Sequence, residues 1–259
     1  MRPERLRRAE AVEEVQARRP DLIVLADYGQ LVPAALLEVP LGALNLHPSL
    51  LPRHRGATPV PATILAGDTR TGVSLMRMDA GLDTGPLVAV HEITLAGNET
   101  TPELEARLAG EGAALLAANL GAWIRGEVEP RQQATEGATL TRPLRRADGR
   151  LDAAEPAERL ERQVRAYQPW PGSWLDTDAG RLTVWRAGAR RGGAGNPPVP
   201  GELVALTSGS LALATGKGLL ELVEVQPAGG RRMTAGDLLR GRPALAGSRV
   251  HEGQIEPVG

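Results

Sequence analysis

A change of pattern near residue 126 is the feature that most constrains the fold of this 259-residue chain. Before it, stretches with helical spacing alternate with short apolar runs; after it, short apolar runs recur between Gly and Pro clusters. Residues 2–19 carry apolar side chains at helical spacing. Residues 21–26 (DLIVLA) form a continuous apolar run, typical of a strand covered on both faces. The first half therefore predicts an α/β domain.

The other elements of the first half follow from the same periodicities. Thr101 and Pro102 make a cap and a first helical position, so a helix is expected to begin there. The expected elements are a helix over 58–65, strands over 72–78 and 87–95, and a helix from Thr101 to about Ile124.

Residues 127–155 are polar, rich in Arg, Gly, Pro and Glu, and weakly periodic, which is typical of a linker. We therefore expect one domain over 1–126 and a second over 156–259. Short strands separated by Gly and Pro favour a small β-barrel in the second domain. Its expected elements are a helix over 156–168 and strands over 181–187, 202–206, 210–215 and 219–226.

Asn45 and His47 are the first candidates for chemistry. They lie two residues apart in a short apolar run, GALNLH, that Pro48 ends, so as strand residues they share a face at its C-terminal end. Ligands bind at that end of open parallel sheets. Asp83, 36 residues after His47, adds a carboxylate. The residues alone leave alternatives open: a turn cap at Asn45, an ordinary strand-end histidine, and an aspartate that caps its own turn.

The sequence around these residues, SLLPRHRGATPVPATILAGDTRTGVSLMRMDAGLDTGPLVA over 49–89, resembles the signature of the 10-formyltetrahydrofolate-dependent formyltransferases. Further matches are DLIVLADYGQLVP at 21–33, RAYQPWPGSW at 165–174 and the stretch over 213–241. The second half is most similar to the members that act on methionyl-initiator tRNA. The resemblance implies an incomplete Rossmann-like formyltransferase domain followed by an OB-like β-barrel that binds tRNA.

The resemblance also implies roles. A formyl group would pass from 10-formyltetrahydrofolate to the α-amine of methionyl-initiator tRNA. Asn45 would donate to the formyl oxygen, His47 would add a second donor or steady the intermediate, and Asp83 would carry the proton. His54 departs from the family pattern, which usually has tryptophan there. The residues expected to line the folate are Ser49, Leu50, Leu51 and Pro52, and the loop over 79–83 is expected to wrap its pterin.

The start of the chain is a larger departure. The strand, glycine-containing turn, helix and basic loop with which the family begins do not precede Met1, so we expect a fragment or a misassigned start, with weak tRNA binding and little activity. Two other readings stay open: an inactive piece that retains RNA binding, and a formyltransferase for a sugar nucleotide or glycinamide ribotide.

Charge and composition narrow the partners. The net charge of −1 combines 12 basic and 17 acidic residues over 1–130 with 18 basic and 14 acidic residues over 131–259. Arginine clusters in the second half fit either a solvated surface or one that follows phosphates. With no cysteine and no zinc-like histidine spacing, we expect no metal. We expect a cytoplasmic monomer without a membrane segment. The clustered arginines are Arg142, Arg145, Arg146, Arg150, Arg231, Arg232, Arg240, Arg242 and Arg249.

Overall fold

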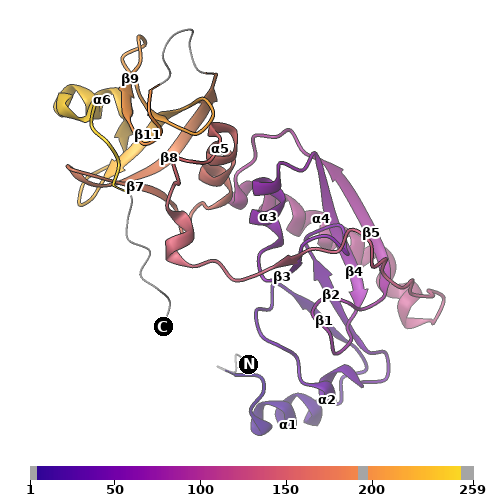
Figure 1. Ribbon diagram of the computed structural model, residues 1–259. Coiled ribbons are helices and arrows are strands. Elements are labelled where there is room, and N and C mark those ends of the chain that lie inside the picture. The colour runs from indigo at the N-terminus through magenta and orange to yellow at the C-terminus, as the bar shows by residue number, and fades with distance from the viewer. Residues whose placement is uncertain (1–4, 192–197, 252–259) are drawn as a thin grey trace. The chain divides into compact units, whose positions relative to one another are not determined.

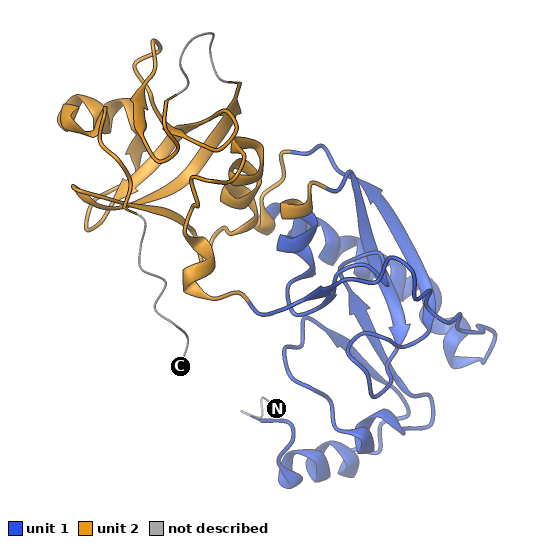
Figure 2. Ribbon diagram, in the orientation of Figure 1, with its two compact units in different colours: residues 1–63, 68–97, 103–143 blue, residues 64–67, 98–102, 144–259 orange. Residues whose placement is uncertain are grey.

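The computed structural model describes residues 5–191 and 198–251 and divides into two compact units (Figures 1 and 2). Unit 1 comprises Met1–Thr63, Asp68–Gly97 and Glu103–Pro143. Unit 2 comprises Ile64–Gly67, Asn98–Pro102 and Leu144–Gly259. The division after Pro143 falls inside the segment 127–155. The domain limits predicted from the sequence, 1–126 and 156–259, stay a prediction.

Unit 1 is built on a four-stranded mixed sheet with the order β1-β2-β4-β5 (Figure 1). Only β1 and β2 run parallel; β4 lies antiparallel to both β2 and β5. The α/β class is therefore confirmed, with the parallel part of this four-stranded sheet confined to one strand pair. The strands are β1 (Ile23–Ala26), β2 (Ala43–His47), β4 (Arg70–Arg77) and β5 (Leu87–Thr94).

Helices α3 and α4 follow the expected boundaries closely. α3 begins at Pro59, whose fixed φ and missing N–H suit a first helical turn. In α4 the buried side chains Leu104 and Leu108 are four residues apart and lie on one face. On the sheet, Leu44 and Leu75 are fully buried. The helices are α1 (Ala9–Ala17), α2 (Ala34–Leu37), α3 (Pro59–Ala66) and α4 (Thr101–Ile124).

Two expectations for the start of the chain are wrong. The helix predicted over 2–19 begins only at Ala9, after a turn that buries Leu6. Strand β1 is not covered on both faces, because Val24 is 40% exposed. Among the described residues β1 pairs only with β2, so it is an edge strand and the continuous apolar run does not report burial.

The segment 127–155 is more ordered than its composition predicts. β6 (Leu140–Thr141) pairs in parallel with β3 (Arg55–Gly56), and Arg131 forms a bridge with Leu87. A 3-10 helix, η1 (Arg146–Gly149), follows. Residues 131–141 thus supply polar groups to the turn between β2 and α3, on which the candidate site depends.

Unit 2 contains an all-antiparallel sheet with the order β7-β8-β11-β10-β9, and β12 pairs with β11. No pairing joins β7 to β9 among the described residues, so the sheet is a curled half-barrel, consistent with the predicted OB-like domain. Its elements are α5 (Ala157–Ala166), β7 (Ser173–Thr177), β8 (Gly180–Arg190), β9 (Leu203–Ala205), β10 (Leu211–Ala214), β11 (Leu219–Pro227), β12 (Met233–Thr234), α6 (Ala235–Gly241) and η2 (Pro243–Leu245).

Helix α5 closes the hydrophobic core of unit 2. Leu160 and Val164, four residues apart on the helix, are fully buried in the same cluster as Leu211 and Leu220 of the sheet. In the described parts of the chain, no helix is both long and apolar enough to cross a membrane.

Leu160→Ala should lower the free energy of unfolding of unit 2 by about 2 to 5 kcal/mol, because it removes a buried side chain and leaves a cavity. The matched control is Val199→Ala, since Val199 is 54% exposed and should change stability by less than about 0.5 kcal/mol. Urea unfolding followed by tryptophan fluorescence measures both, and similar losses in the two variants would contradict the assigned core.

Candidate active site

Asn45 and His47 lie at alternate positions near the C-terminal end of β2, as predicted. His47 is buried and Asn45 half-buried, and both pair with β4, at Ser74 and Met76 respectively. Among the described residues, the Asn45 amide makes no side-chain hydrogen bond. Its donors are therefore available to an oxygen outside the protein.

The imidazole of His47 is held between two turns. Its Nε2 lies 2.9 Å from the carbonyl oxygen of His54. A carbonyl can only accept, so Nε2 carries the hydrogen and donates it. Nδ1 faces Asp83, with its nitrogen 3.7 Å from Oδ2. The hydrogen bond to His54 therefore leaves Nδ1 as the ring atom able to take a proton, and that atom faces a carboxylate.

Asp83 reaches His47 from the loop after β4. Its backbone is in the left-handed region, with φ of 53°, and its Oδ2 accepts a hydrogen bond from the Gly56 N–H at 2.8 Å. The Gln133 amide donates to the carbonyl oxygens of Asp83 (2.8 Å) and Gly85 (2.7 Å). Arg55 in turn donates to Gln133 Oε1. The Asp83 carboxylate is thus held by Gly56 and its backbone carbonyl by Gln133, one residue before it in the sequence and one after it.

Burial lowers the pKa of His47 from its ordinary value of 6.5. The charge of Asp83 and the hydrogen bond to His54 act in the opposite direction but are smaller. The imidazole is consequently neutral at pH 7, with a proton on Nε2 and a lone pair on Nδ1.

The four residues expected to line a folate form a tight turn after β2. Ser49 is fully buried; its hydroxyl donates to the carbonyl of Arg53 at 2.6 Å, and its own carbonyl accepts from Ser74 at 2.7 Å. The same Ser74 hydroxyl accepts from the Leu51 N–H. Leu50 is half-buried beside Gly72: a Cβ added at Gly72 would lie 2.8 Å from Cδ2 of Leu50. Pro52 completes this turn. The folate-binding role of residues 49–52 stays a prediction.

The loop over 79–83, expected to wrap a pterin, is closed by Asp79. Its carboxylate accepts hydrogen bonds from the Thr84 hydroxyl at 2.8 and 3.0 Å and from the Gly81 N–H at 2.9 Å. Gly85 allows the chain to return to the sheet, because a Cβ there would lie 1.8 Å from the Arg77 carbonyl oxygen.

Sequence reasoning missed Gln133 and Asp68, which help hold this site together, and it named His54 without predicting its contact. Gln133, in the expected linker, fixes the Asp83 loop, while Asp68 and the side chain of His54 fix the turn that faces His47. Asp68 lies in the resembling stretch, but no spacing pattern distinguishes it. Gln133 follows Asp83 by 50 residues in a segment without period, so no local signal could have found it.

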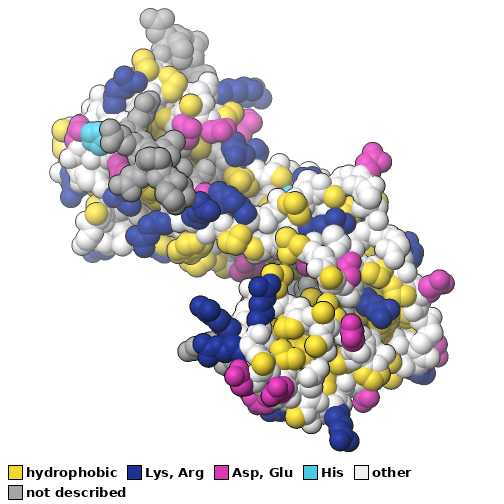
Figure 3. All heavy atoms as spheres, turned by 60° about the horizontal axis from the view of Figure 1, so that its bottom comes forward, with side chains coloured by type: hydrophobic (Ala, Val, Ile, Leu, Met, Phe, Trp, Pro, Cys, Tyr) yellow, Lys and Arg dark blue, Asp and Glu magenta, His cyan; other side chains and the backbone are white. Residues whose placement is uncertain are grey.

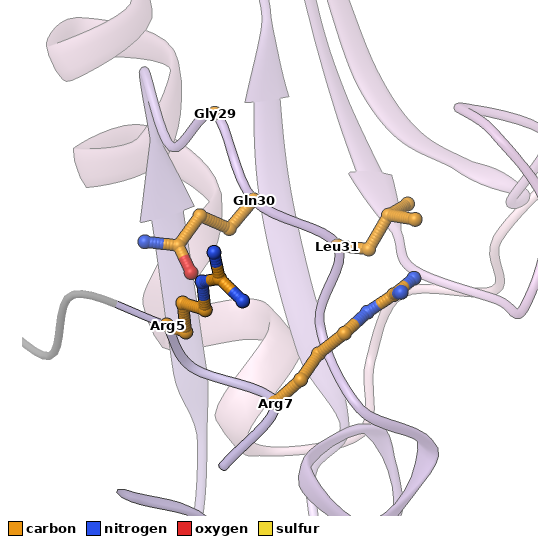
Figure 4. Close-up of a pocket in the computed structure, with 5 residues that line it drawn as sticks. All are labelled: Arg5, Arg7, Gly29, Gln30 and Leu31. Atoms are coloured by element: carbon orange, nitrogen blue, oxygen red, sulfur yellow. The ribbon is translucent and has the colours of Figure 1, made fainter.

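A pocket of about 410 Å³ lies elsewhere on unit 1. Figure 4 shows Arg5 beside Gln30 and Arg7 extending toward Leu31, with Gly29 completing the lining. None of the predicted site residues lines it. Over 5–191 and 198–251, no group of three or more His, Asp or Glu side chains could hold a metal ion.

The chain is similar in sequence to known formyltransferases. Residues 1–120 match the family described as formyl transferase, and residues 143–243 match the formyl transferase C-terminal domain. A methionyl-tRNA formyltransferase from Halorhodospira halophila is 45% identical over 250 residues, covering 96% of this chain and 79% of the relative. The chain belongs to the methionyl-tRNA formyltransferase family. Membership in this family confirms the predicted resemblance and the enzyme class.

Solved structures with a similar fold include formyltransferases at low identity. The methionyl-tRNA formyltransferase from Clostridium thermocellum has a TM-score of 0.55 at 19% identity, covering 69% of this chain and 77% of that one. HypX from Aquifex aeolicus, solved with tetrahydrofolic acid, has a TM-score of 0.64 at 18% identity, covering 88% of this chain and 40% of that one. Both confirm the fold class that the sequence predicted for this member of the methionyl-tRNA formyltransferase family.

The pKa of His47 predicts a pH dependence of stability. Because the folded-state value lies below 6.5, the unfolded chain takes up this proton first as pH falls. The free energy of unfolding should therefore fall as pH decreases below about 6.5, and His47→Gln should remove part of that fall. His91→Gln, at an exposed histidine paired with Glu111, is the control. Urea titrations between pH 8 and pH 5 give the slopes; an unchanged slope in His47→Gln would contradict the buried neutral imidazole.

Proposed function

We propose that this chain transfers a formyl group from 10-formyltetrahydrofolate to the α-amine of methionyl-initiator tRNA. The observation that carries the proposal is the 45% identity to a methionyl-tRNA formyltransferase over 96% of the chain. The HypX structure with tetrahydrofolic acid supports a folate co-substrate for this fold. An aminoacylated tRNA as substrate implies action in the cytoplasm, during translation initiation.

Asn45 is the proposed oxyanion donor. When the amine nitrogen attacks the formyl carbon, negative charge develops on the formyl oxygen, and the free amide of Asn45 at the end of β2 is suited to bind it. The hydrogen bond from Asn45 to the formyl oxygen strengthens as negative charge develops on that oxygen. Half-burial of Asn45 limits the access of water, which makes the bond stronger than it would be in solvent. Removal of one such donor typically costs on the order of 3 kcal/mol in the transition state.

Asp83 and Nδ1 of His47 form the proposed proton path. The new bond joins the amine nitrogen to the formyl carbon, and the bond from that carbon to the folate nitrogen breaks. The proton released by the amine passes to Asp83 and then to the leaving folate nitrogen, directly or through water. Nδ1 of His47 faces Asp83 with a lone pair. Once Asp83 has taken the proton from the amine, it can therefore donate a hydrogen bond to Nδ1 until the proton passes to the folate nitrogen. The fixed Nε2 donor to His54 keeps this arrangement in place.

Ser49, Leu50, Leu51 and Pro52 are the proposed folate-lining residues. The turn that carries them begins two residues after His47, and Ser74 braces it at the Ser49 carbonyl and the Leu51 N–H. The turn follows the end of β2 directly, so a folate held by it would lie near Asn45 and His47. This supports a co-substrate site beside Asn45 and His47.

Unit 2 carries the proposed tRNA-binding surface, because residues 131–259 hold 18 basic and 14 acidic residues. Figure 3 shows Lys and Arg side chains, in dark blue, spread over the visible face and interspersed with Asp and Glu, in magenta. Arg232 stacks over Trp185, with its guanidinium carbon 3.4 Å from the ring centroid, and forms no ion pair with a described residue. Arg181 stacks over Trp174 at 3.7 Å but pairs with Asp176. Of these two stacked arginines, Arg232 is the one free to meet a phosphate or a base.

Asn45→Ala and Asp83→Asn should each lower the single-turnover formylation rate of methionyl-tRNA by at least about a hundredfold, because each removes a group that acts in the transition state. Glu92→Gln, in an exposed pair with Arg70, is the control and should leave the rate unchanged. An unchanged rate in Asp83→Asn would refute the proton-carrier role. Preference for an amino-sugar nucleotide or glycinamide ribotide in the same assay would refute the proposed acceptor.

Arg232→Ala should weaken tRNA binding and reduce the slope of log K against log salt by about 1, because one phosphate contact is lost. Arg181→Ala is the matched control: it removes a stacked arginine already neutralised by Asp176 and should change the slope less. Filter binding or fluorescence anisotropy at 50 to 200 mM salt measures both. Equal slopes in Arg232→Ala and the wild type would place tRNA elsewhere.

A further inference from the structure

A charged cluster that the proposed reaction does not use is joined to His47 through His54. Arg53 donates to both carboxylate oxygens of Asp68, at 3.0 Å and 2.6 Å. The Nε2 of His54 lies 2.8 Å from Asp68 Oδ2, so it carries a hydrogen and donates it. The side chains of Asp68 and His54 are only 17% and 8% exposed. A carboxylate in such a place needs its two partners, and both come from the turn that faces His47.

His54 is held at three points. Its ring is bound to Asp68, its N–H donates to the Thr139 hydroxyl at 2.8 Å, and its carbonyl accepts from Nε2 of His47 at 2.9 Å. Its backbone is left-handed, with φ of 58°, a conformation that a residue with a Cβ rarely adopts. Such a conformation persists only where the surroundings fix it.

The direction of the His54 carbonyl decides which nitrogen of His47 carries the proton. While the carbonyl points at Nε2, the hydrogen stays there and Nδ1 presents a lone pair toward Asp83, 3.7 Å away. If this peptide turned away, the hydrogen could move to Nδ1 and bond to the Asp83 carboxylate. Asp83 would then be occupied by a donor when the amine needs it as a proton acceptor.

We propose that Asp68 is a positioning residue for the reaction, which orients the His54 carbonyl and so keeps His47 in the tautomer that leaves Nδ1 and Asp83 free to handle the proton. The proposal rests on the proposed function for its effect on rate, and on geometry alone for its effect on the tautomer.

The charge state of Asp68 fits this role. Burial acts to raise the pKa of its carboxyl, but the hydrogen bonds from Arg53 and His54, with their charges, outweigh burial and lower it. Asp68 is therefore ionised at neutral pH, and the His54 ring stays bound as a donor. The charged or titratable groups that face His47 itself are Asp83 and His54.

The test is the tautomer of His47, read from imidazole ¹⁵N chemical shifts at neutral pH. The chain has four histidines, so His→Gln variants assign the signals. The wild type should show a hydrogen on Nε2 of His47. Asp68→Ala should populate the Nδ1-protonated tautomer and lower kcat for formylation by about ten- to hundredfold, with KM for the folate changed less than about twofold.

Asp68→Asn and Glu92→Gln complete the series. The Asn amide oxygen still accepts from His54, so Asp68→Asn should restore most of the wild-type tautomer and rate. Glu92→Gln removes a carboxylate from an exposed ion pair on the same sheet and should change neither. If Asp68→Ala does not fold, Arg53→Met takes its place, because it removes the two hydrogen bonds from Arg53 that hold Asp68. Arg53→Met should shift the His47 tautomer in the same direction, but by less.

Destabilisation by Asp68→Ala with the His47 tautomer unchanged would overturn the proposal, since it would show a purely structural carboxylate. A rescued rate in Asp68→Asn without a rescued tautomer would overturn it as well. Failure of the proposed function looks different: the wild type would transfer no formyl group to methionyl-tRNA while the tautomer still responded to Asp68→Ala.

Discussion

The candidate site depends on the hydrogen bond from His47 Nε2 to the carbonyl oxygen of His54, at 2.9 Å. It joins the end of β2 to the turn before α3, and it assigns the two ring nitrogens different properties: one is committed as a donor, the other presents a lone pair. Without it the imidazole could turn or exchange its hydrogen, and Asp83 would face a donor as readily as an acceptor. A bond between one ring and one peptide group thus determines the electrostatics of the whole site.

Burial reinforces that assignment. The His47 side chain is 5% exposed, and burial lowers its pKa more than the Asp83 charge raises it. A more exposed ring beside the same carboxylate would have a higher pKa, so it would take up a second proton at a higher pH and the proton path would begin occupied there. The chemistry assigned to Asp83 therefore requires both a nearby imidazole and the exclusion of water from it. The ring lies at the end of a central strand, since β2 pairs with β1 on one side and with β4 on the other.

Much of this arrangement could be predicted because it is local. The spacing of Asn45 and His47 gave their shared face, and the periodicities gave α3, β4, β5 and α4 within a few residues. What could not be predicted is long-range: Thr139 bonds to His54 across 85 residues, and Gln133 to Asp83 across 50. Such bonds leave no period in the sequence. The apolar run of β1 misled for a related reason, since burial depends on which neighbours a strand has.

The polar, non-periodic segment over 131–141 stabilises two turns whose backbone conformation is unfavourable. His54 and Asp83 are both left-handed, which costs residues with a Cβ roughly 1 to 2 kcal/mol each. Thr139 binds the N–H of His54, and Gln133 binds the carbonyls of Asp83 and Gly85, in bonds worth about 0.5 to 1.5 kcal/mol each. These bonds are together of the same size as the strain, so they can offset it. The segment thereby fixes, on either side of His47, the carbonyl and the carboxylate that define its two nitrogens.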